Sequence, residues 1–197
     1  ENTNLAGGKL AAKYQYVSAE ELIAKMKTAF RNAKEPEILS ELETVGITES
    51  NLDDYLLEIA DLEQLSQKQI KEYGEQYAET DKFNLKRIEI DRLYTRHRNL
   101  AKIIFKGDRQ SNTTLGIDEG RKRAFAAWFQ QVSNFYAQIL ANPDFKTKAE
   151  TVNIKDPDIT AQQTALEQIT ALKASQKKEI GEAQKATDTR DEALDLL

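Results

Sequence analysis

The feature that most constrains the fold is the stretch 48–106, which contains no proline and a single glycine, Gly74. Its apolar residues recur at spacings of three and four, which is the period of an α-helix and not of a strand. Thr48 is a suitable N-cap, and Gly107 suits the position after the last turn. Because one glycine costs only about 1 kcal/mol relative to alanine in a helix, we expect one continuous helix, with a kink at Gly74 as the alternative.

At about 1.5 Å per residue such a helix would be roughly 85 Å long. This length is typical of coiled coils and elongated bundles rather than of small globular domains. Glycine and proline are scarce (8 and 3 residues), and 31% of the residues are charged. This composition favours a soluble, helix-rich chain with narrow apolar helix faces. We therefore predict an all-α, elongated helical bundle with very long, coiled-coil-like helices.

The second half of the chain resembles the first. Pro36-Glu37-Ile38 is matched by Pro143-Asp144-Phe145, and 43–47 (ETVGI) is matched by 150–154 (ETVNI) at the same offset. Each half then reads as a helix, a short helix led by proline, and a long helix, so we predict two pseudo-repeats. The predicted parts are an extended N-terminal arm over 1–17, a first helical repeat over 18–106, a loop over 107–117, and a second helical repeat over 118–197.

The second repeat is expected to be incomplete at its C-terminus. The last predicted helix opens at Asp156-Pro157 and keeps its apolar spacing to Leu197, whereas its counterpart in the first repeat runs further. Either the chain continues beyond Leu197, or another subunit covers the exposed end. In the arm, Tyr14 and Tyr16 would share one face of an extended segment over 10–17, which makes them candidate assembly residues.

The net charge of −5 hides an asymmetry. Between Lys86 and Arg123, eleven lysine and arginine residues face five acids, which leaves +6 there and −11 elsewhere. This polarity suits head-to-tail self-association or an anionic partner such as an acidic protein surface, although a solvated helix surface would also explain it. A sequence pI near 5.2 argues against a dedicated nucleic-acid protein. The candidate partner-binding residues are Arg96, Arg98, Arg109, Arg121, Lys122 and Arg123.

Several kinds of chemistry are excluded by residue counts. The chain has no cysteine, and its one histidine, His97, cannot build a di-iron or histidine zinc site. His97 lies among apolar positions of the long helix, so we expect it to pack in the core. No acid–base or nucleophile pair can be named, and we predict no enzyme activity, no cofactor and no metal site. No apolar run approaches the length that crosses a bilayer, so membrane insertion is not expected; the compartment stays open.

A polar layer is predicted where the last helix meets the long one. Gln176, Thr187 and Arg190 fall on the apolar face of the last helix, and a buried arginine needs carbonyl or carboxylate partners. Such a layer would set the register between the two halves, or alternatively form a small-ligand pocket. The candidate partners on the long helix are Gln69, Gln76 and Thr80.

The C-terminal part of the chain resembles a group of uncharacterised bacterial all-helical proteins. The resemblance covers residues 116–197 and rests on Gly120-Arg121-Lys122-Arg123-x-Phe125-x-x-Trp128, Phe135-Tyr136, Gly181-Glu182-Ala183-Gln184 and Arg190-Asp191. It implies a helical fold whose last helix runs into a further apolar stretch. It implies no activity and no functional residue.

Two functions are compatible with these observations. The first is a non-enzymatic structural or assembly subunit that self-associates through its arm and the apolar faces of its helices. The alternative is a soluble helical binding module that recognises an anionic partner through the basic end of the bundle.

Overall fold

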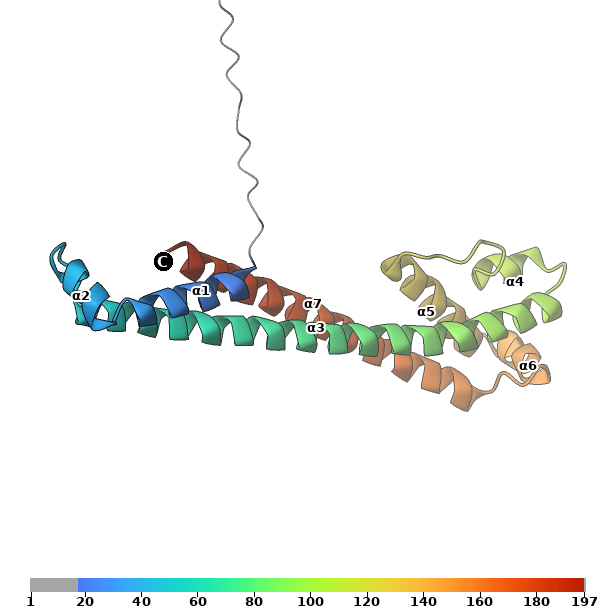
Figure 1. Cartoon of the computed structure of the whole chain (residues 1–197). Coiled ribbons are helices and arrows are strands. Elements are labelled where there is room, and N and C mark those ends of the chain that lie inside the picture. Colours follow the sequence, from blue (N-terminus) through green and yellow to red (C-terminus); the bar gives the residue numbers. More distant parts are fainter. Residues whose placement is uncertain (1–17, 197) are drawn as a thin grey trace, which may run out of the picture. The chain divides into compact units, whose positions relative to one another are not determined.

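The computed structural model describes residues 18–196, and every regular element in this range is an α-helix, which confirms the all-α prediction (Figure 1). The predicted arm with Tyr14 and Tyr16 lies outside the described residues. No helix within 18–196 is both long and apolar enough to cross a membrane. The helices are α1 (Ala19–Asn32), α2 (Pro36–Glu43), α3 (Glu49–Ile104), α4 (Arg109–Thr114), α5 (Phe125–Ala141), α6 (Pro143–Thr151) and α7 (Asp156–Asp195).

The chain divides into two compact units. Among the described residues, the first unit contains 18–70 and 185–196, and the second contains 71–184. Helices α3 and α7 each contribute to both units, whereas α1 and α2 belong to the first and α4, α5 and α6 to the second.

Helix α3 is continuous through Gly74, as predicted. At its start the Thr48 hydroxyl accepts a hydrogen bond from the Asn51 amide at 3.4 Å, and Asn51 Oδ1 accepts one from the Thr48 amide at 2.9 Å. This reciprocal pair satisfies amides that an open helix end leaves free. After the helix, Gly107 adopts φ +84°, a conformation that glycine reaches without steric cost.

The first unit is built from α1, the start of α3 and the end of α7. Two contacts show that α1 runs antiparallel to α3: Phe30 stacks on Tyr55 with ring centroids 5.1 Å apart, and Lys27 Nζ lies 2.6 Å from Glu63. Helix α2 buries no residue. The small core consists of Ile23, Ile59 and Leu62, with partly buried Met26, Phe30, Leu65, Ala193 and Leu194 against it.

The second unit has the larger core, and α5 lies at its centre, as its apolar face predicts. Trp128, Phe135 and Tyr136 are almost wholly buried, and Tyr94 of α3 meets Phe135 edge to face at 5.4 Å. Helix α7 runs antiparallel to α3 here, since Thr80 bonds Gln176 while the earlier Glu72 lies beside Glu182. Helices α4 and α6 cover one end of this core through Leu115, Phe145 and Ala149.

The start of α5 differs from the prediction. The predicted second repeat begins at residue 118, whereas its first helix, α5, begins only at Phe125. Asp118 accepts a hydrogen bond from the Thr113 hydroxyl at 2.8 Å and lies in the segment before the helix. The predicted loop over 107–117 also contains a helix, α4, which Asp108 caps by accepting from the Ser111 amide.

His97 packs inside the second unit, as predicted. It is 3% exposed, and its Nδ1 lies 3.1 Å from the Tyr136 hydroxyl. Burial lowers the pKa of His97 below its usual 6.5, and the nearby Arg96 lowers it further against an opposing effect of Asp158. The neutral imidazole is therefore the form that the fold favours.

This gives a pH prediction. The unfolded chain takes up a proton at His97 near pH 6.5 while the folded chain does not, so the stabilisation is complete above that pH and is lost as the pH falls toward the lower folded pKa. We expect the free energy of unfolding, measured by urea titration, to decrease from about pH 7.5 to about pH 5. In His97→Gln the slope over this range should be flatter. An equal slope in both proteins would show that other groups cause it.

Candidate functional site

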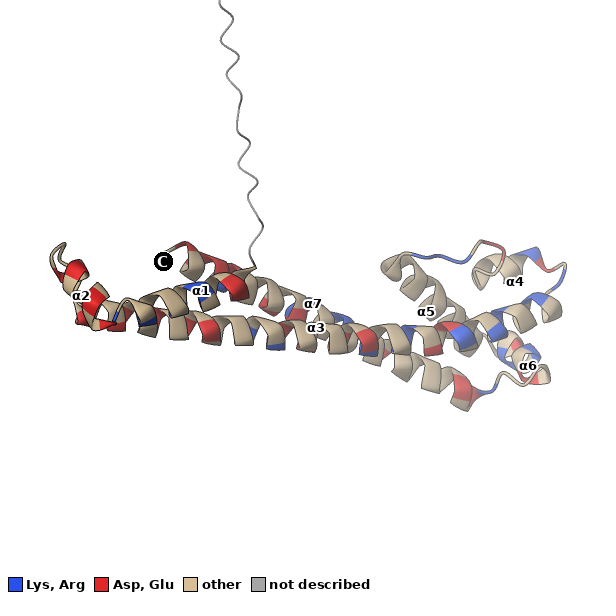
Figure 2. Cartoon of the chain, in the orientation of Figure 1, with Lys and Arg blue, Asp and Glu red and all other residues tan. Residues whose placement is uncertain are grey.

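The most site-like feature of the second unit is the segment 117–124, which precedes α5 and carries Arg121, Lys122 and Arg123. We call it the clamped loop, because side chains from α3 and α5 hold its backbone although it has no regular secondary structure. Figure 2 shows Lys and Arg along this loop and in the last turns of α3. The tripeptide therefore precedes α5 instead of opening it, so its cations do not lie in the first turn of the helix, where the positive N-terminus would disfavour them.

Arg98 is the first clamp. It is 6% exposed, and its Nη2 donates to the carbonyl of Ile117 at 3.1 Å and to the carbonyl of Glu119. Within residues 18–196 it forms no ion pair, and its Nε has no hydrogen-bond partner. The prediction grouped Arg98 with exposed cations. The structure instead places it inside, where it holds the loop and offers no charge to an external partner.

Gln131 of α5 is the second clamp. This buried side chain accepts from the Lys122 amide at 3.0 Å and donates to the Gly120 carbonyl at 3.1 Å. Arg87 of α3 donates to the Arg123 carbonyl at 2.5 Å, and its guanidinium lies 5.1 Å from the centre of the Trp128 ring. The backbone of the loop is thus satisfied by side chains rather than by a helix or strand.

Asp91 joins the loop to both helices. It lies on α3, accepts from Trp128 Nε1 of α5 at 2.9 Å, and forms an ion pair with Arg121 of the loop. Arg121 is therefore engaged by the protein itself. This leaves Lys122 and Arg123 as the cations that the loop presents to solvent, and only Lys122 has an ion-pair partner in the described residues, Glu119 at 2.7 Å.

The remaining basic candidates lie elsewhere in the second unit. Arg96 is exposed on α3, and Arg109 is exposed as the first residue of α4. Neither forms an ion pair within the described part of the chain. The six predicted residues are therefore the buried clamp Arg98, two exposed residues with ion-pair partners in the protein (Arg121 and Lys122), and three exposed cations without one in the described residues (Arg96, Arg109 and Arg123).

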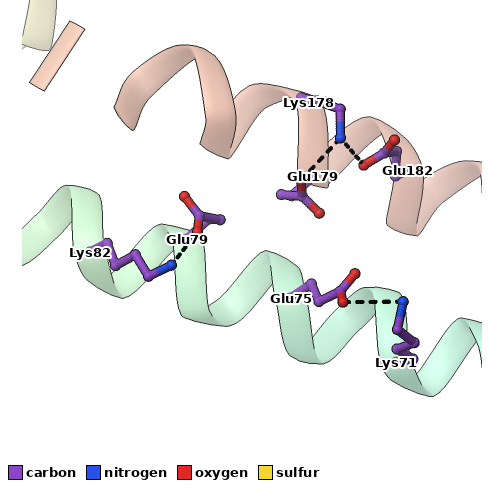
Figure 3. Close-up of polar contacts among 7 residues, drawn as sticks. All are labelled: Lys71, Glu75, Glu79, Lys82, Lys178, Glu179 and Glu182. Carbon is purple, nitrogen blue, oxygen red and sulfur yellow. Dashed lines mark hydrogen bonds and ion pairs between the residues drawn. The ribbon is translucent and has the colours of Figure 1, made fainter. Parts of the chain in front are cut away.

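Sequence analysis did not foresee a carboxylate cluster between α3 and α7 in the second unit. Ligand atoms of Glu72, Glu179 and Glu182 all lie within 4.8 Å of one another. Figure 3 shows Glu179 and Glu182 on α7 facing Glu75 and Glu79 on α3. The spacing of Glu179 and Glu182, three residues apart, indicates a shared helix face, but which helix they would meet depends on the tertiary structure.

Lysines neutralise much of this cluster. Lys178 Nζ lies 2.8 Å from Glu182 and 3.4 Å from Glu179, and Lys82 bonds Glu79 at 2.5 Å. The hydrogen bond from Lys178 lowers the pKa of Glu182. Hydrogen bonds from Lys82 and then from Ser175 lower the pKa of Glu79. Lys82 lies on the same helix as Glu79, and Lys178 lies on the same helix as Glu179 and Glu182, so these ion pairs run along α3 or α7 and do not join the two helices.

The residues of the predicted polar layer make contacts in each unit. In the first unit Gln69 donates to the Thr187 hydroxyl at 3.1 Å, and Arg190 donates to Gln69 Oε1. In the second unit Gln176 donates to the Thr80 hydroxyl at 3.2 Å. Each contact joins α3 to α7, so these polar groups distinguish one register of the two helices from another.

Comparisons of the chain with protein-family models, with curated proteins and with solved structures found no match.

The clamp predicts a stability effect. In Arg98→Met the carbonyls of Ile117 and Glu119 lose their donor inside the protein, so we expect the free energy of unfolding to fall by about 1–3 kcal/mol. The matched control is Arg123→Met in the same loop, which removes an exposed side chain and should change stability by less than about 0.5 kcal/mol. Urea titration of both variants tests this, and equal effects would contradict the assigned role of Arg98.

Proposed function

We propose that this chain is a non-enzymatic helical assembly subunit that associates with copies of itself. The observation that carries the proposal is an exposed apolar face on the part of α3 in the second unit. We call it the outer face of α3. Its large apolar residues are Tyr77 (62% exposed), Leu85 (68%), Ile88 (64%) and Ile103 (69%).

These residues lie on one side of the helix. Phe83, Ile90 and Tyr94 of α3 are buried against the core, and the 100° turn per residue places the outer face about opposite to them. Single exposed apolar residues are ordinary on protein surfaces. Several on one helix face, at spacings typical of helix–helix contacts, favour a binding surface instead.

The charge distribution supports a second copy as the partner. The described residues of the first unit contain sixteen aspartates and glutamates against seven lysines and arginines, a net charge of −9. The second unit contains nineteen lysines and arginines against sixteen acids, a net charge of +3. Figure 2 shows the acidic residues along α2. Opposite charges on two units of one chain favour association between copies over long-range repulsion.

The order of the helices agrees with the proposed pseudo-repeats. Helix α1, the proline-led α2 and the long α3 are followed, after α4, by α5, the proline-led α6 and the long α7. We propose that these two sets descend from one duplicated unit with coiled-coil-like long helices. Such chains use helix faces, rather than catalytic clefts, as their working surfaces.

Self-association gives a direct prediction. The mass measured by light scattering should rise with protein concentration, because burial of apolar surface between copies is favoured by mass action. A chain lacking residues 1–17, measured alongside, separates the predicted contribution of the arm from that of the helices. A monomer mass at all concentrations, in both low and high salt, would contradict the proposal.

The alternative, recognition of an anionic partner, is favoured by the clamped loop. Buried side chains hold its backbone, so binding through Lys122 and Arg123 would cost little backbone entropy. Loops that carry charged residues on a rigid scaffold are typical binding elements. The chemistry that fits is an acidic peptide or acidic protein surface.

This alternative predicts binding that depends on salt. A polyglutamate peptide should bind the chain, and affinity should fall as ionic strength rises, because exposed charges are screened. Lys122→Glu together with Arg123→Glu should abolish binding without unfolding the chain. Reversal of two other exposed cations, in Lys155→Glu with Lys177→Glu, is the control. Equal loss in both double variants would indicate a response to net charge alone.

A further inference from the structure

We propose that the outer face of α3 binds the same face of a second copy in an antiparallel arrangement, with a two-fold axis passing beside residues 86 and 87. This inference rests on the proposed self-association and adds its geometry and its residues. It predicts an isologous contact, in which both copies use one surface.

Exposed residues recur along the outer face of α3 at a spacing of eleven residues. Gly74, Leu85 and Arg96 are separated by eleven residues each, and so are Tyr77, Ile88 and Asn99. Eleven residues make three nearly whole turns, so these positions stay on one side of a helix over a long distance. Asp81 and Arg92 are also eleven residues apart, and they lie on the same side of the helix as these two series. All eight residues are exposed.

An antiparallel two-fold axis pairs residues of this face in one copy with complementary residues in the other. An axis midway between residues 86 and 87 brings Leu85 of each copy level with Ile88 of the other. One turn further out, Asp81 meets Arg92. The next pair outward is Tyr77 with Arg96, and beyond it Gly74 meets Asn99, a small residue against a polar one. The operator thus pairs apolar with apolar, acid with base, and an aromatic ring with a guanidinium.

A parallel pair of α3 helices in register would lose the pairing of opposite charges. A parallel pair in register would bring Asp81 against Asp81 and Arg92 against Arg92, and like charges at such positions oppose association. The charged residues of the face are also available. Within residues 18–196, Asp81, Arg92 and Arg96 form no ion pair with any side chain. Charge complementarity therefore selects a second copy in the antiparallel orientation.

The central apolar pair and the flanking ion pairs would have different effects. Leu85 and Ile88 are about two-thirds exposed in the single chain, so their contact supplies apolar burial next to the axis. The Asp81–Arg92 pairs occur twice in the dimer and become partly desolvated there. They would contribute mainly to orientation and register, as polar residues do in coiled coils.

The experiment is a charge exchange, read out by analytical ultracentrifugation of the full chain. Asp81→Arg and Arg92→Asp are expected each to weaken dimerisation by about tenfold or more, since each variant places two like-charge pairs in the contact. An equimolar mixture of the two variants should form a heterodimer, because every altered position then faces an opposite charge. Glu167→Arg, an exposed acid on α7 with no ion pair in the described residues, is the matched control and should dimerise like the unaltered chain.

The outcomes separate this inference from the proposed function. If the chain self-associates and the mixture restores what the single variants lose, the contact is established. If it self-associates with the same affinity in all variants, the assembly proposal stands while this contact is wrong. If the unaltered chain is a monomer throughout, both are overturned.

A second measurement tests orientation independently of affinity. The chain contains no cysteine, so introduced cysteines report only on chosen positions. Leu85→Cys mixed with Ile88→Cys should form a disulfide-linked dimer faster than either variant alone, because the antiparallel contact brings these two positions together. Faster cross-linking of Leu85→Cys with itself would indicate a parallel pair and would overturn the proposed arrangement.

Discussion

The structure of the second unit depends on the burial of one side of α3. Ile90, Tyr94 and Ala101 are almost fully buried against α5 and its neighbours, and this contact places the large aromatic residues of the core. A helix that buries one side leaves the other in water unless a further layer covers it. The outer face of α3 lies on the side of the helix away from the core, so its apolar residues remain exposed in the single chain. These exposed residues are the basis of the proposed assembly.

Polar side chains, rather than secondary structure, determine how the chain enters α5. Arg98, Gln131 and Asp91 satisfy the backbone and charges of the clamped loop, and Asp91 of α3 also accepts a hydrogen bond from Trp128 of α5. Buried polar groups of this kind destabilise the fold when only partly satisfied. The same network holds the backbone that carries the exposed cations of the loop, and Asp91 also ties α3 to α5.

Between α3 and α7, acidic residues of the two helices lie close together, and lysines pair with several of them. Glu179 and Glu79 have side chains only 14% and 17% exposed, so a nearby cation offsets part of the cost of burying each carboxylate. Lys178 and Lys82 supply these cations within hydrogen-bond distance. Because each lysine pairs with carboxylates of its own helix, these ion pairs reduce the repulsion between the acidic residues where α3 and α7 meet.

The sequence by itself determined the all-α class, the uninterrupted α3 and the packed His97, because each follows from local periodicity, capping or residue type. It could not show that Arg98 is buried while Arg96 is exposed, or that α5 begins at Phe125. Periodicity indicates which side of a helix is apolar, but it does not indicate which element packs against that side. Only the tertiary structure decided these points, since the partners of Arg98 and Gln131 are backbone groups of a loop whose path depends on how α3 and α5 meet.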